Sequence, residues 1–201
     1  MMNSCDIRSY YAAIDPDEYF RRFRDPERFA GFCRECGRYA KCWSCPPFGY
    51  DAQVCPDGYR QVWVVGTRIA PHRDLRARTR SREDVVRAGR ELLRQVRARV
   101  DEVLLAMEAR HPGSRAFFAG TCMWCPEGAC TRGEGRACRF PEKMRPSLEA
   151  FGWDMVRTSA ELLGVEMKWS RDGEWPEYFT LVSGFFTGSQ IDRREWEEVF
   201  G

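Results

Sequence analysis

The longest regular pattern of apolar and polar positions in the chain lies between residues 81 and 111. Ser81 and Asp84 fit a Ser-x-x-acid capping pattern, in which each side chain accepts a hydrogen bond from the other residue's backbone N–H. Beyond them, apolar residues recur at spacings compatible with one helical face, namely Val85, Leu92, Val96, Val103 and Met107. Pro112 and Gly113 follow, and together they end a helix. The pattern predicts a long helix from Ser81 to about His111.

Shorter helical patterns occur on both sides of this segment. They are a capped helix that begins at Asp15-Pro16, a short turn at Asp25-Pro26, a helix over 146–163 with a break at Gly152, and a short helix from Asp192. Proline suits the first position of a helix, where its missing N–H has no partner to lose. Gly164 is expected to end the third of these elements, because glycine adopts the left-handed conformation of a helix C-cap.

Four short runs rich in β-branched and aromatic residues predict strands. They cover residues 60–69, 115–120, 165–169 and 178–186. The order of the main elements is then strand, helix, strand, helix, strand, strand, without a fixed-period repeat. This order predicts a single α+β domain over residues 1–201, with a mixed sheet of about four strands and two main helices.

Two segments, 32–58 and 121–145, interrupt these patterns with Cys, Gly and Pro. Such composition is typical of loops and supplies few apolar side chains to a core, so another interaction must order them. The chain has ten cysteines and only two histidines, and all the cysteines except Cys5 lie in these segments. We interpret both segments as metal-binding loops inserted in the domain.

The N-terminal segment indicates the compartment in which these cysteines work. Residues 1–17 contain neither the basic region, the apolar stretch nor the small-residue cleavage site of a signal peptide. No window approaches the roughly 18 apolar residues that span a bilayer. We therefore expect a cytoplasmic protein without membrane contact, whose clustered thiols are metal ligands or redox groups and not disulfides.

The first segment contains two Cys-x-x-Cys pairs, Cys33 with Cys36 and Cys42 with Cys45. Two intervening residues allow both thiolates of a pair to face one metal ion or one cluster. Two such pairs in close succession predict a four-cysteine metal site. Cys5 and Cys55 stay unassigned to either site.

The second segment supplies another four thiols within a short stretch, Cys122, Cys125, Cys130 and Cys138. These four also have a spacing that allows them to close around one site. Basic residues follow or interleave them, namely Arg132, Arg136, Arg139, Lys143 and Arg145. They would balance the negative charge of a thiolate-bound cluster, as would the N-terminal end of a helix starting after Pro146; the alternative is a solvated basic loop.

Sets of thiolates without histidine suit zinc or an iron–sulfur cluster. His72 and His111 each adjoin a proline at the end of a predicted element, so we interpret them as exposed or helix-terminal imidazoles. Cys33-x-x-Cys36-Gly resembles a zinc knuckle, but the next cysteine pair follows much sooner than the second pair of a zinc site usually does.

Proline after cysteine favours the iron–sulfur alternative. Cys45, Cys55 and Cys125 are each followed directly by proline, as a cluster-ligating cysteine of bacterial ferredoxins is. We therefore expect one or two 4Fe-4S clusters, with zinc as the alternative.

The motifs together resemble a known family. Cys33-x-x-Cys36-x-x-Tyr39, Trp43-Ser44-Cys45-Pro46-Pro47, Cys138-Arg-Phe-Pro141 and the segment 145–152 occur in this chain in the family's order. The family comprises prokaryotic, cysteine-rich, predicted metal-binding proteins of unknown function (domain-of-unknown-function family 2284). The resemblance implies a cysteine-bound metal or cluster in a cytoplasmic setting and brings no established reaction with it.

The chain departs from the family pattern at three positions. The family motif implies three cysteines in the first segment, corresponding to Cys33, Cys36 and Cys45, so that Cys42 is an extra thiol. Phe140 stands where histidine is expected and Leu148 where methionine is usual. The four cysteines of the second segment are unaffected by these changes.

Three functions are compatible with these features. The first is an iron–sulfur protein with an electron-transfer or redox accessory role, whose Arg-rich segment 73–99, with ten arginines against four acidic residues, would dock an acidic redox partner. Trp43 and Trp124, beside the cysteines, would shield a cluster from water unless they are ordinary core aromatics.

The second is an iron–sulfur enzyme with an open coordination position on the first cysteine motif, although the chain has no accompanying catalytic motif. The third is a structural zinc module that contacts nucleic acid. That function is disfavoured, because the net charge is only +2 and aromatic residues for base stacking are almost absent from the basic segment.

Overall fold

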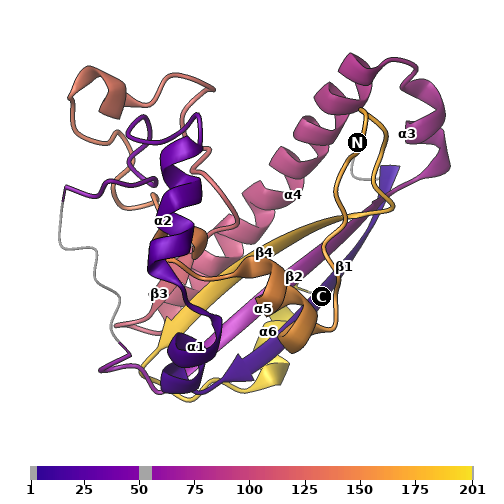
Figure 1. The fold of residues 1–201 in the computed structure, drawn as a ribbon. Coiled ribbons are helices and arrows are strands. Elements are labelled where there is room, and N and C mark those ends of the chain that lie inside the picture. Colours follow the sequence, from indigo (N-terminus) through magenta and orange to yellow (C-terminus); the bar gives the residue numbers. More distant parts are fainter. Residues whose placement is uncertain (1–3, 50–55, 201) are drawn as a thin grey trace.

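The computed structural model describes residues 4–49 and 56–200, which form a four-stranded sheet with helices on both faces (Figure 1). The strands are β1 (Cys5–Ile14), β2 (Gln61–Pro71), β3 (Arg115–Phe117) and β4 (Phe179–Thr187). Their spatial order is β1-β2-β4-β3, and every pairing is antiparallel. The α+β class is confirmed, and the expectation of a mixed sheet is wrong.

The observed strands differ from the expected strands in two segments, residues 5–14 and 165–169. The N-terminal residues of the chain form β1, which pairs with β2 from Cys5 opposite Pro71 to Ile14 opposite Val62. This edge strand is exposed over much of its length, so it lacks the apolar run or alternation by which a strand is predicted. Residues 165–169, expected to be a strand, form no strand.

Six helices occur in the described part of the chain. They are α1 (Pro16–Phe23), α2 (Pro26–Glu35), α3 (Arg73–Arg78), α4 (Arg82–Arg110), α5 (Met155–Leu163) and α6 (Arg193–Phe200). Helix α4 begins with the expected capping box, in which the Ser81 and Asp84 side chains each accept from the other residue's backbone N–H. None of the helices is both long enough and apolar enough to cross a membrane.

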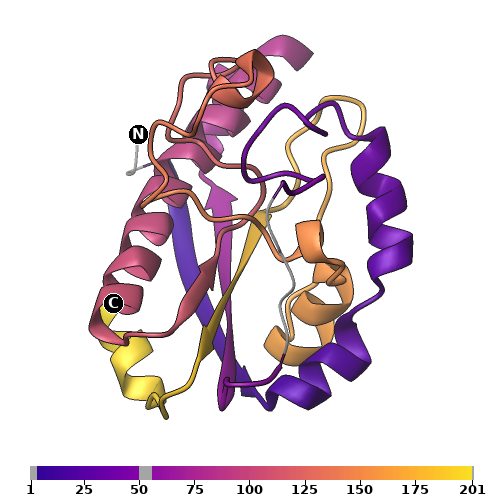
Figure 2. The same cartoon turned by 90° about the vertical axis from the view of Figure 1, so that its left-hand side faces the viewer.

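The sheet separates two layers of helices, with α4 and α6 on one face and α1 and α5 on the other (Figure 2). Strand β2 has to be apolar on both sides, because successive side chains of a strand point to opposite faces. Accordingly Trp63 and Val65 pack with α4 and α6, whereas Val62 and Val64 pack with α1 and α5.

Aromatic side chains dominate both cores. The rings of Trp63 and Trp196 lie 5.7 Å apart under α6, and Tyr19 stacks on Trp153 at 5.7 Å on the opposite face. Trp153, Trp196 and Tyr19 are fully buried. Truncating a buried ring of this size typically costs about 3–5 kcal/mol, so these contacts fix the two helical layers to the sheet.

Helix α2 carries the start of the first cysteine segment. Asp25-Pro26 starts a ten-residue helix and not the short turn expected, so Cys33 lies in a helix and Cys36 is its C-cap. The helix was missed because Cys33 and Cys36 were attributed to a loop on the basis of their Cys-Gly-Pro surroundings.

The segment before α5 also differs from the prediction. A helix was expected from Pro146, but residues 149–151 form a 3₁₀ turn and α5 begins only at Met155, capped by Asp154. Gly152 between them has φ +96°, and a Cβ there would lie 2.5 Å from the Cα of Pro26. The close approach to α2 stops a continuous helix here, so no helix N-terminus follows Pro146 to face the cysteines.

Candidate metal centre

The two cysteine loops lie side by side at one end of the sheet and are joined by direct hydrogen bonds. The backbone N–H of Cys122 donates to Oγ of Ser44 at 3.0 Å. Trp43 Nε1 donates to the carbonyl of Arg136 at 3.2 Å. Cys45 Sγ lies 3.7 Å from Oγ1 of Thr121. Residues that are far apart in sequence therefore form one composite structure.

Arg132 of the second loop is the most connected residue between the loops. Its guanidinium donates to the carbonyl of Cys42 at 2.7 Å and also to the carbonyls of Cys45 and Pro47. It also lies 5.4 Å from the ring centroid of Trp43. The carbonyl of Cys42 also accepts from the backbone N–H of Cys45 at 3.0 Å, and Arg132 supplies a donor to the carbonyls of Cys45 and Pro47. Because backbone carbonyls of an irregular loop need such partners, Arg132 shapes the first loop and is not a solvated charge.

The other basic residues of the second loop also have structural partners. Arg145 forms a two-pronged ion pair with Glu108 of α4, with both carboxylate oxygens 2.9 Å from Nε. Lys143 lies 5.1 Å from the Trp124 ring centroid, and Arg139 donates to the Ala129 carbonyl at 3.0 Å. Arg136 pairs with Glu134. These contacts stabilise the loop itself. Cys138 Sγ accepts a hydrogen bond of 3.4 Å from the backbone N–H of Phe140 and not from one of these basic side chains.

The cysteines of the first loop are buried to different degrees. Cys42 is 7% exposed, Cys33 and Cys45 are half-buried, and Cys36 is exposed. Burial, together with the neighbouring thiols Cys45 and Cys130, raises the pKa of Cys42 to about 11. Burial likewise raises the pKa of Cys33, with contributions from Cys45 and Cys36. Cys45 is thus an electrostatic neighbour of both Cys33 and Cys42.

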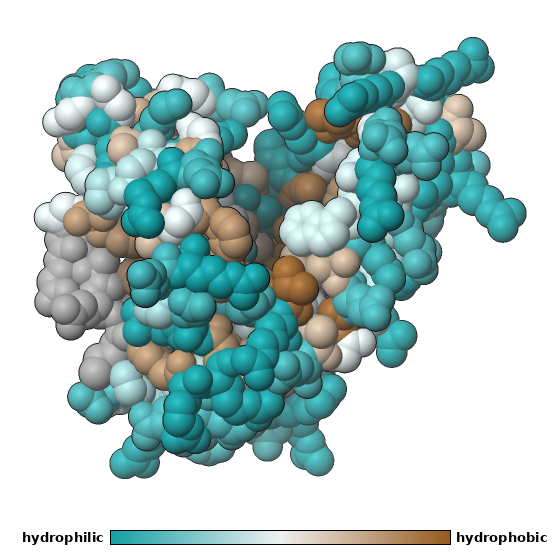
Figure 3. Space-filling view, viewed as in Figure 1, coloured by the Kyte–Doolittle hydropathy of each residue, from teal (hydrophilic) through white to brown (hydrophobic). Residues whose placement is uncertain are grey.

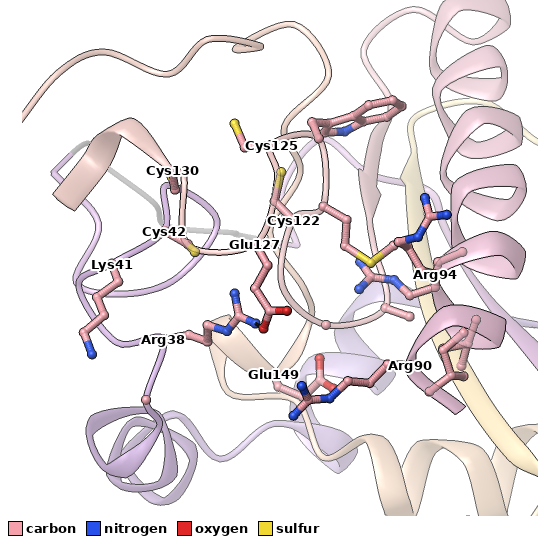
Figure 4. A pocket seen from close by; sticks show the side chains of 18 of the residues that line it. Arg38, Lys41, Cys42, Arg90, Arg94, Cys122, Cys125, Glu127, Cys130 and Glu149 are labelled. Atoms are coloured by element: carbon pink, nitrogen blue, oxygen red, sulfur yellow. Dashed lines mark hydrogen bonds and ion pairs between the residues drawn. The ribbon is translucent and has the colours of Figure 1, made fainter. Parts of the chain in front are cut away.

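The cysteines of the second loop are all half-buried. Burial raises the pKa of Cys122 to about 11, and Cys138, Cys125 and Cys130 add to this effect. Cys130 also neighbours Cys42 of the first loop, and Figure 4 shows the two residues side by side. The sequence predicted two separate sets of four thiols, and this contact brings the sets together.

The thiols gather without closing around a common point. Across residues 4–49 and 56–200, no three Cys, His, Asp or Glu side chains are arranged so that they could share one metal ion. The donor set nevertheless fits a thiophilic metal: eight sulfur atoms lie in two loops that contact each other, and soft thiolates select zinc or iron–sulfur clusters. The residues that would hold such a group are Cys33, Cys36, Cys42, Cys45, Cys122, Cys125, Cys130 and Cys138.

The remaining candidate ligands lie elsewhere or outside the described residues. His72 precedes α3 and lies 3.0 Å from Asp6, and His111 ends α4 and lies 2.8 Å from Glu195. The interpretation of both as helix-terminal imidazoles is confirmed. Cys5 is buried in the core under α4, and Cys55 lies outside the described residues.

A cavity of about 1100 Å³ borders the cysteine loops and was not foreseen from the sequence. Its walls come from both loops, from α4 and from β4. Figure 3 shows the surface hollowed between the part that carries the cysteine loops and the part formed by α4. The thiols of Cys42, Cys122, Cys125 and Cys130 belong to residues of its lining (Figure 4).

Arginines of α4 provide the cationic side of this cavity. Arg90, Arg94 and Arg97 line it, and their spacing of four and three residues places them on one helical face. That spacing was the available sequence signal, but it lay within a longer run of arginines that suggested only a charged surface.

Arg97 is buried, with 9% of its side chain exposed, and lies 3.7 Å from Asp101, which is also buried. It donates to the carbonyl of Thr121 at 2.9 Å, which fixes the residue before Cys122 to α4. Its Nε and Oδ1 of Asp101 are buried without a hydrogen-bond partner in the described structure. Burial raises the pKa of Asp101, because a carboxylate loses hydration there.

Comparison with known proteins adds one match. A family model described as "Predicted metal-binding protein (DUF2284)" matches residues 22–183, a range that includes α2, both cysteine loops and α4. This match confirms the resemblance identified from the cysteine motifs. No curated protein and no solved structure gives a significant match.

Proposed function

The chain belongs to the DUF2284 family of predicted metal-binding proteins, and on that premise we propose that its two cysteine loops hold an iron–sulfur cluster, most simply of the 4Fe-4S type. The observation that carries the proposal is the contact between the loops. Cys42 and Cys130 are neighbours, and Ser44 holds the backbone of Cys122. All eight candidate ligands therefore lie in one composite structure.

The composition of the donor set supports iron–sulfur chemistry. Both histidines are engaged far from the loops, so a mixed His/Cys zinc site has no histidine to use. Cys45 and Cys125 are followed by Pro46 and Pro126, as in ferredoxin-type ligand motifs. The alternative is zinc bound by four thiolates, which metal analysis distinguishes from an iron–sulfur cluster.

Two tryptophans support a redox role. Trp43 and Trp124 are half-buried on the loops, and each has its indole N–H bonded to a loop carbonyl, of Arg136 and Lys143 respectively. Rings held beside the cysteines reduce the access of water, which tunes the potential of a cluster. When bound, such a cluster supplies one-electron transfer, and we propose an electron-transfer or redox accessory role.

The arginine-rich segment offers a docking face for a redox partner. Eight of its arginines are exposed, namely Arg73, Arg78, Arg80, Arg82, Arg87, Arg90, Arg94 and Arg99. Arg82, Arg87 and Arg90 line a shallow hollow that also reaches Glu127 of the second cysteine loop. An acidic protein bound to this face would lie next to the candidate metal centre, and attraction between the two surfaces would speed their encounter.

Metal and sulfide analysis of protein purified without oxygen tests the proposal. We expect iron and acid-labile sulfide in equal amounts, with the broad visible absorption of a cluster. Cys122→Ala should remove most of the iron and the absorption, whereas Cys5→Ala, in the core away from the loops, should retain both. A colourless protein with stoichiometric zinc and no sulfide would exclude an iron–sulfur function.

A further inference from the structure

We propose that the cavity between the cysteine loops and α4 binds a small organic carboxylate with an apolar body. The cavity has a volume of about 1100 Å³, which is in the upper range of pockets that enclose a small ligand. The groups that would recognise the ligand do not include the metal. The cavity nevertheless lies beside the cysteines of the proposed cluster site.

The charged groups that line the cavity leave a positive surplus. Arg38 is paired with Glu127, 3.0 Å away on the opposite loop. Arg94 is paired with Glu91 on its own helix, whereas Arg90 and Lys41 form no ion pair within the described residues. Arginine presents a planar fork of N–H donors that matches a carboxylate, so Arg90 is the natural first contact for an anion.

Glu149 is the other acidic residue of the lining. Burial raises its pKa, which favours the uncharged acid, and its Oε2 atom is buried without a hydrogen-bond partner in the described structure. Glu149 and Arg90 both belong to the lining and are labelled in Figure 4. The burial that favours the uncharged acid also lowers the repulsion that Glu149 would exert on a ligand carboxylate.

The rest of the lining is suited to an apolar body and not to inorganic phosphate. Met155, Met167 and Leu181 belong to the wall, as do Trp124 and Trp169. Trp169 is 66% exposed, so a large aromatic surface at the cavity faces water unless something covers it. Methionine and aromatic side chains adapt to the shape of an apolar ligand.

The cavity also connects such a ligand to the candidate metal centre. Four of the eight candidate ligands contribute to its lining, and Arg97, which lines it as well, is hydrogen-bonded to the residue before Cys122. A carboxylate held by Arg90 would therefore lie against the cysteine loops.

Binding of matched probes to the intact protein, purified without oxygen, tests the proposal. The probe 3-phenylpropionate carries both a carboxylate and an apolar body, 3-phenylpropan-1-ol lacks the charge, and acetate and inorganic phosphate lack the body. By isothermal titration we expect 3-phenylpropionate to bind at least about tenfold more tightly than each of the others. The alcohol lacks the charge-assisted hydrogen bond, which is worth about that factor, and acetate and phosphate lack the apolar body, whose burial is worth at least as much.

Variants locate the binding in the cavity. Arg90→Gln should weaken 3-phenylpropionate binding about tenfold, and Trp169→Ala should weaken it severalfold. Both side chains are exposed, so neither change should affect folding. Arg99→Gln is the control, since Arg99 is an exposed arginine of α4 outside the cavity lining, and it should bind like the wild type.

Several results would overturn the proposal: equal binding of 3-phenylpropionate and the alcohol, phosphate binding as tight as that of 3-phenylpropionate, or unchanged binding in Arg90→Gln. Iron and sulfide are measured on the same preparations. Iron without probe binding refutes the cavity proposal alone, and probe binding without iron refutes the cluster proposal alone.

Discussion

The backbone N–H of Cys122 donates a hydrogen bond of 3.0 Å to Oγ of Ser44, and this contact joins the two cysteine loops at their centre. Ser44 is only 2% exposed, so water is not available to replace it. The residue stands between Trp43 and Cys45, in the motif that identifies the first loop. A single small hydroxyl therefore positions a candidate metal ligand of the other loop.

Replacing Ser44 with alanine should destabilise the composite structure. The change removes the partner of the Cys122 N–H, and an unsatisfied polar group out of reach of water typically costs about 1–3 kcal/mol. Denaturant unfolding followed by tryptophan fluorescence measures the loss. Ser189→Ala, at an exposed position, is the matched control and should stay within about 0.5 kcal/mol of the wild type. Equal stability of Ser44→Ala and Ser189→Ala would show that the contact is dispensable.

The first loop has two possible ligand sets, one with Cys42 and one without it. Cys42 is buried beside Cys45 and Cys130, which favours its being a ligand, so Cys42→Ser should lower the iron bound per chain by at least half. The iron content of anaerobically purified protein, compared with that of Cys5→Ala, is the measurement. Full retention of iron in Cys42→Ser would instead favour the three-cysteine motif of the family, with Cys42 as an extra thiol.

The raised thiol pKa values predict how the metal-free protein responds to alkaline pH. Folding raises the pKa of Cys42 and of Cys122 from 9.0 to about 11. A raised pKa means that the folded state favours the protonated thiol, and this stabilisation is complete below pH 9 and is lost as the pH rises through about 11. The melting temperature of the metal-free protein should therefore fall as the pH rises from 9.0 to about 11, the range set by the ordinary and the raised pKa.

The double variant Cys42→Ser, Cys122→Ser isolates this effect, because the buried tyrosines of the fold contribute equally to both proteins. Its melting temperature should fall less over the same range than that of the metal-free wild type. If the melting temperatures of the two proteins fell equally over this range, folding would not raise the pKa of either thiol. The same protons must be released when a metal binds the thiolates, so metal affinity should increase with pH.

Gly152 is the position where the backbone between the second cysteine loop and α5 depends most on glycine. Its φ is +96°, and an added Cβ would lie 2.5 Å from the backbone of Pro26. Gly152→Ala should therefore destabilise the protein by more than about 2 kcal/mol, through strain and the displacement of α2. Denaturant unfolding, together with iron content, detects both effects.

Gly164→Ala provides the comparison for this prediction. Gly164 also has a positive φ, +65°, but no atom lies within 4 Å of its added Cβ. Its substitution should cost only about 1 kcal/mol, the cost of the left-handed conformation itself. If both variants lose the same stability, the close approach of Gly152 to α2 is unimportant.

Local signals predicted the elements that depend on local interactions. The capping box of Ser81 and Asp84, the apolar periodicity of α4 and the proline after Asp15 each act within one or two helical turns. The buried strands β2 and β4 were also predicted, because a strand covered on both faces must be almost continuously apolar. Gly164 ended α5 as expected.

Elements whose residues are stabilised by distant partners were missed or misjudged. The edge strand β1 has few buried positions, so it has no strong pattern of its own. Strand β3 was predicted over residues 115–120 but extends only from Arg115 to Phe117. The α2 helix was mistaken for a turn followed by a loop, because its cysteines suggested metal chemistry more strongly than its Asp25 cap suggested a helix.

The sequence by itself determined that the chain is an α+β protein with eight candidate ligands in two cysteine motifs, because ligand spacing and helical periodicity are local properties. Only the tertiary structure decided that the two cysteine loops contact each other and that arginines of α4 line a cavity beside them. The physical reason is that Ser44, Arg97 and Arg132 act through hydrogen bonds to the backbone of distant segments. Such contacts produce no periodic pattern in the sequence. A serine or arginine that bonds to a distant backbone group cannot be distinguished, from the sequence, from one that only faces water.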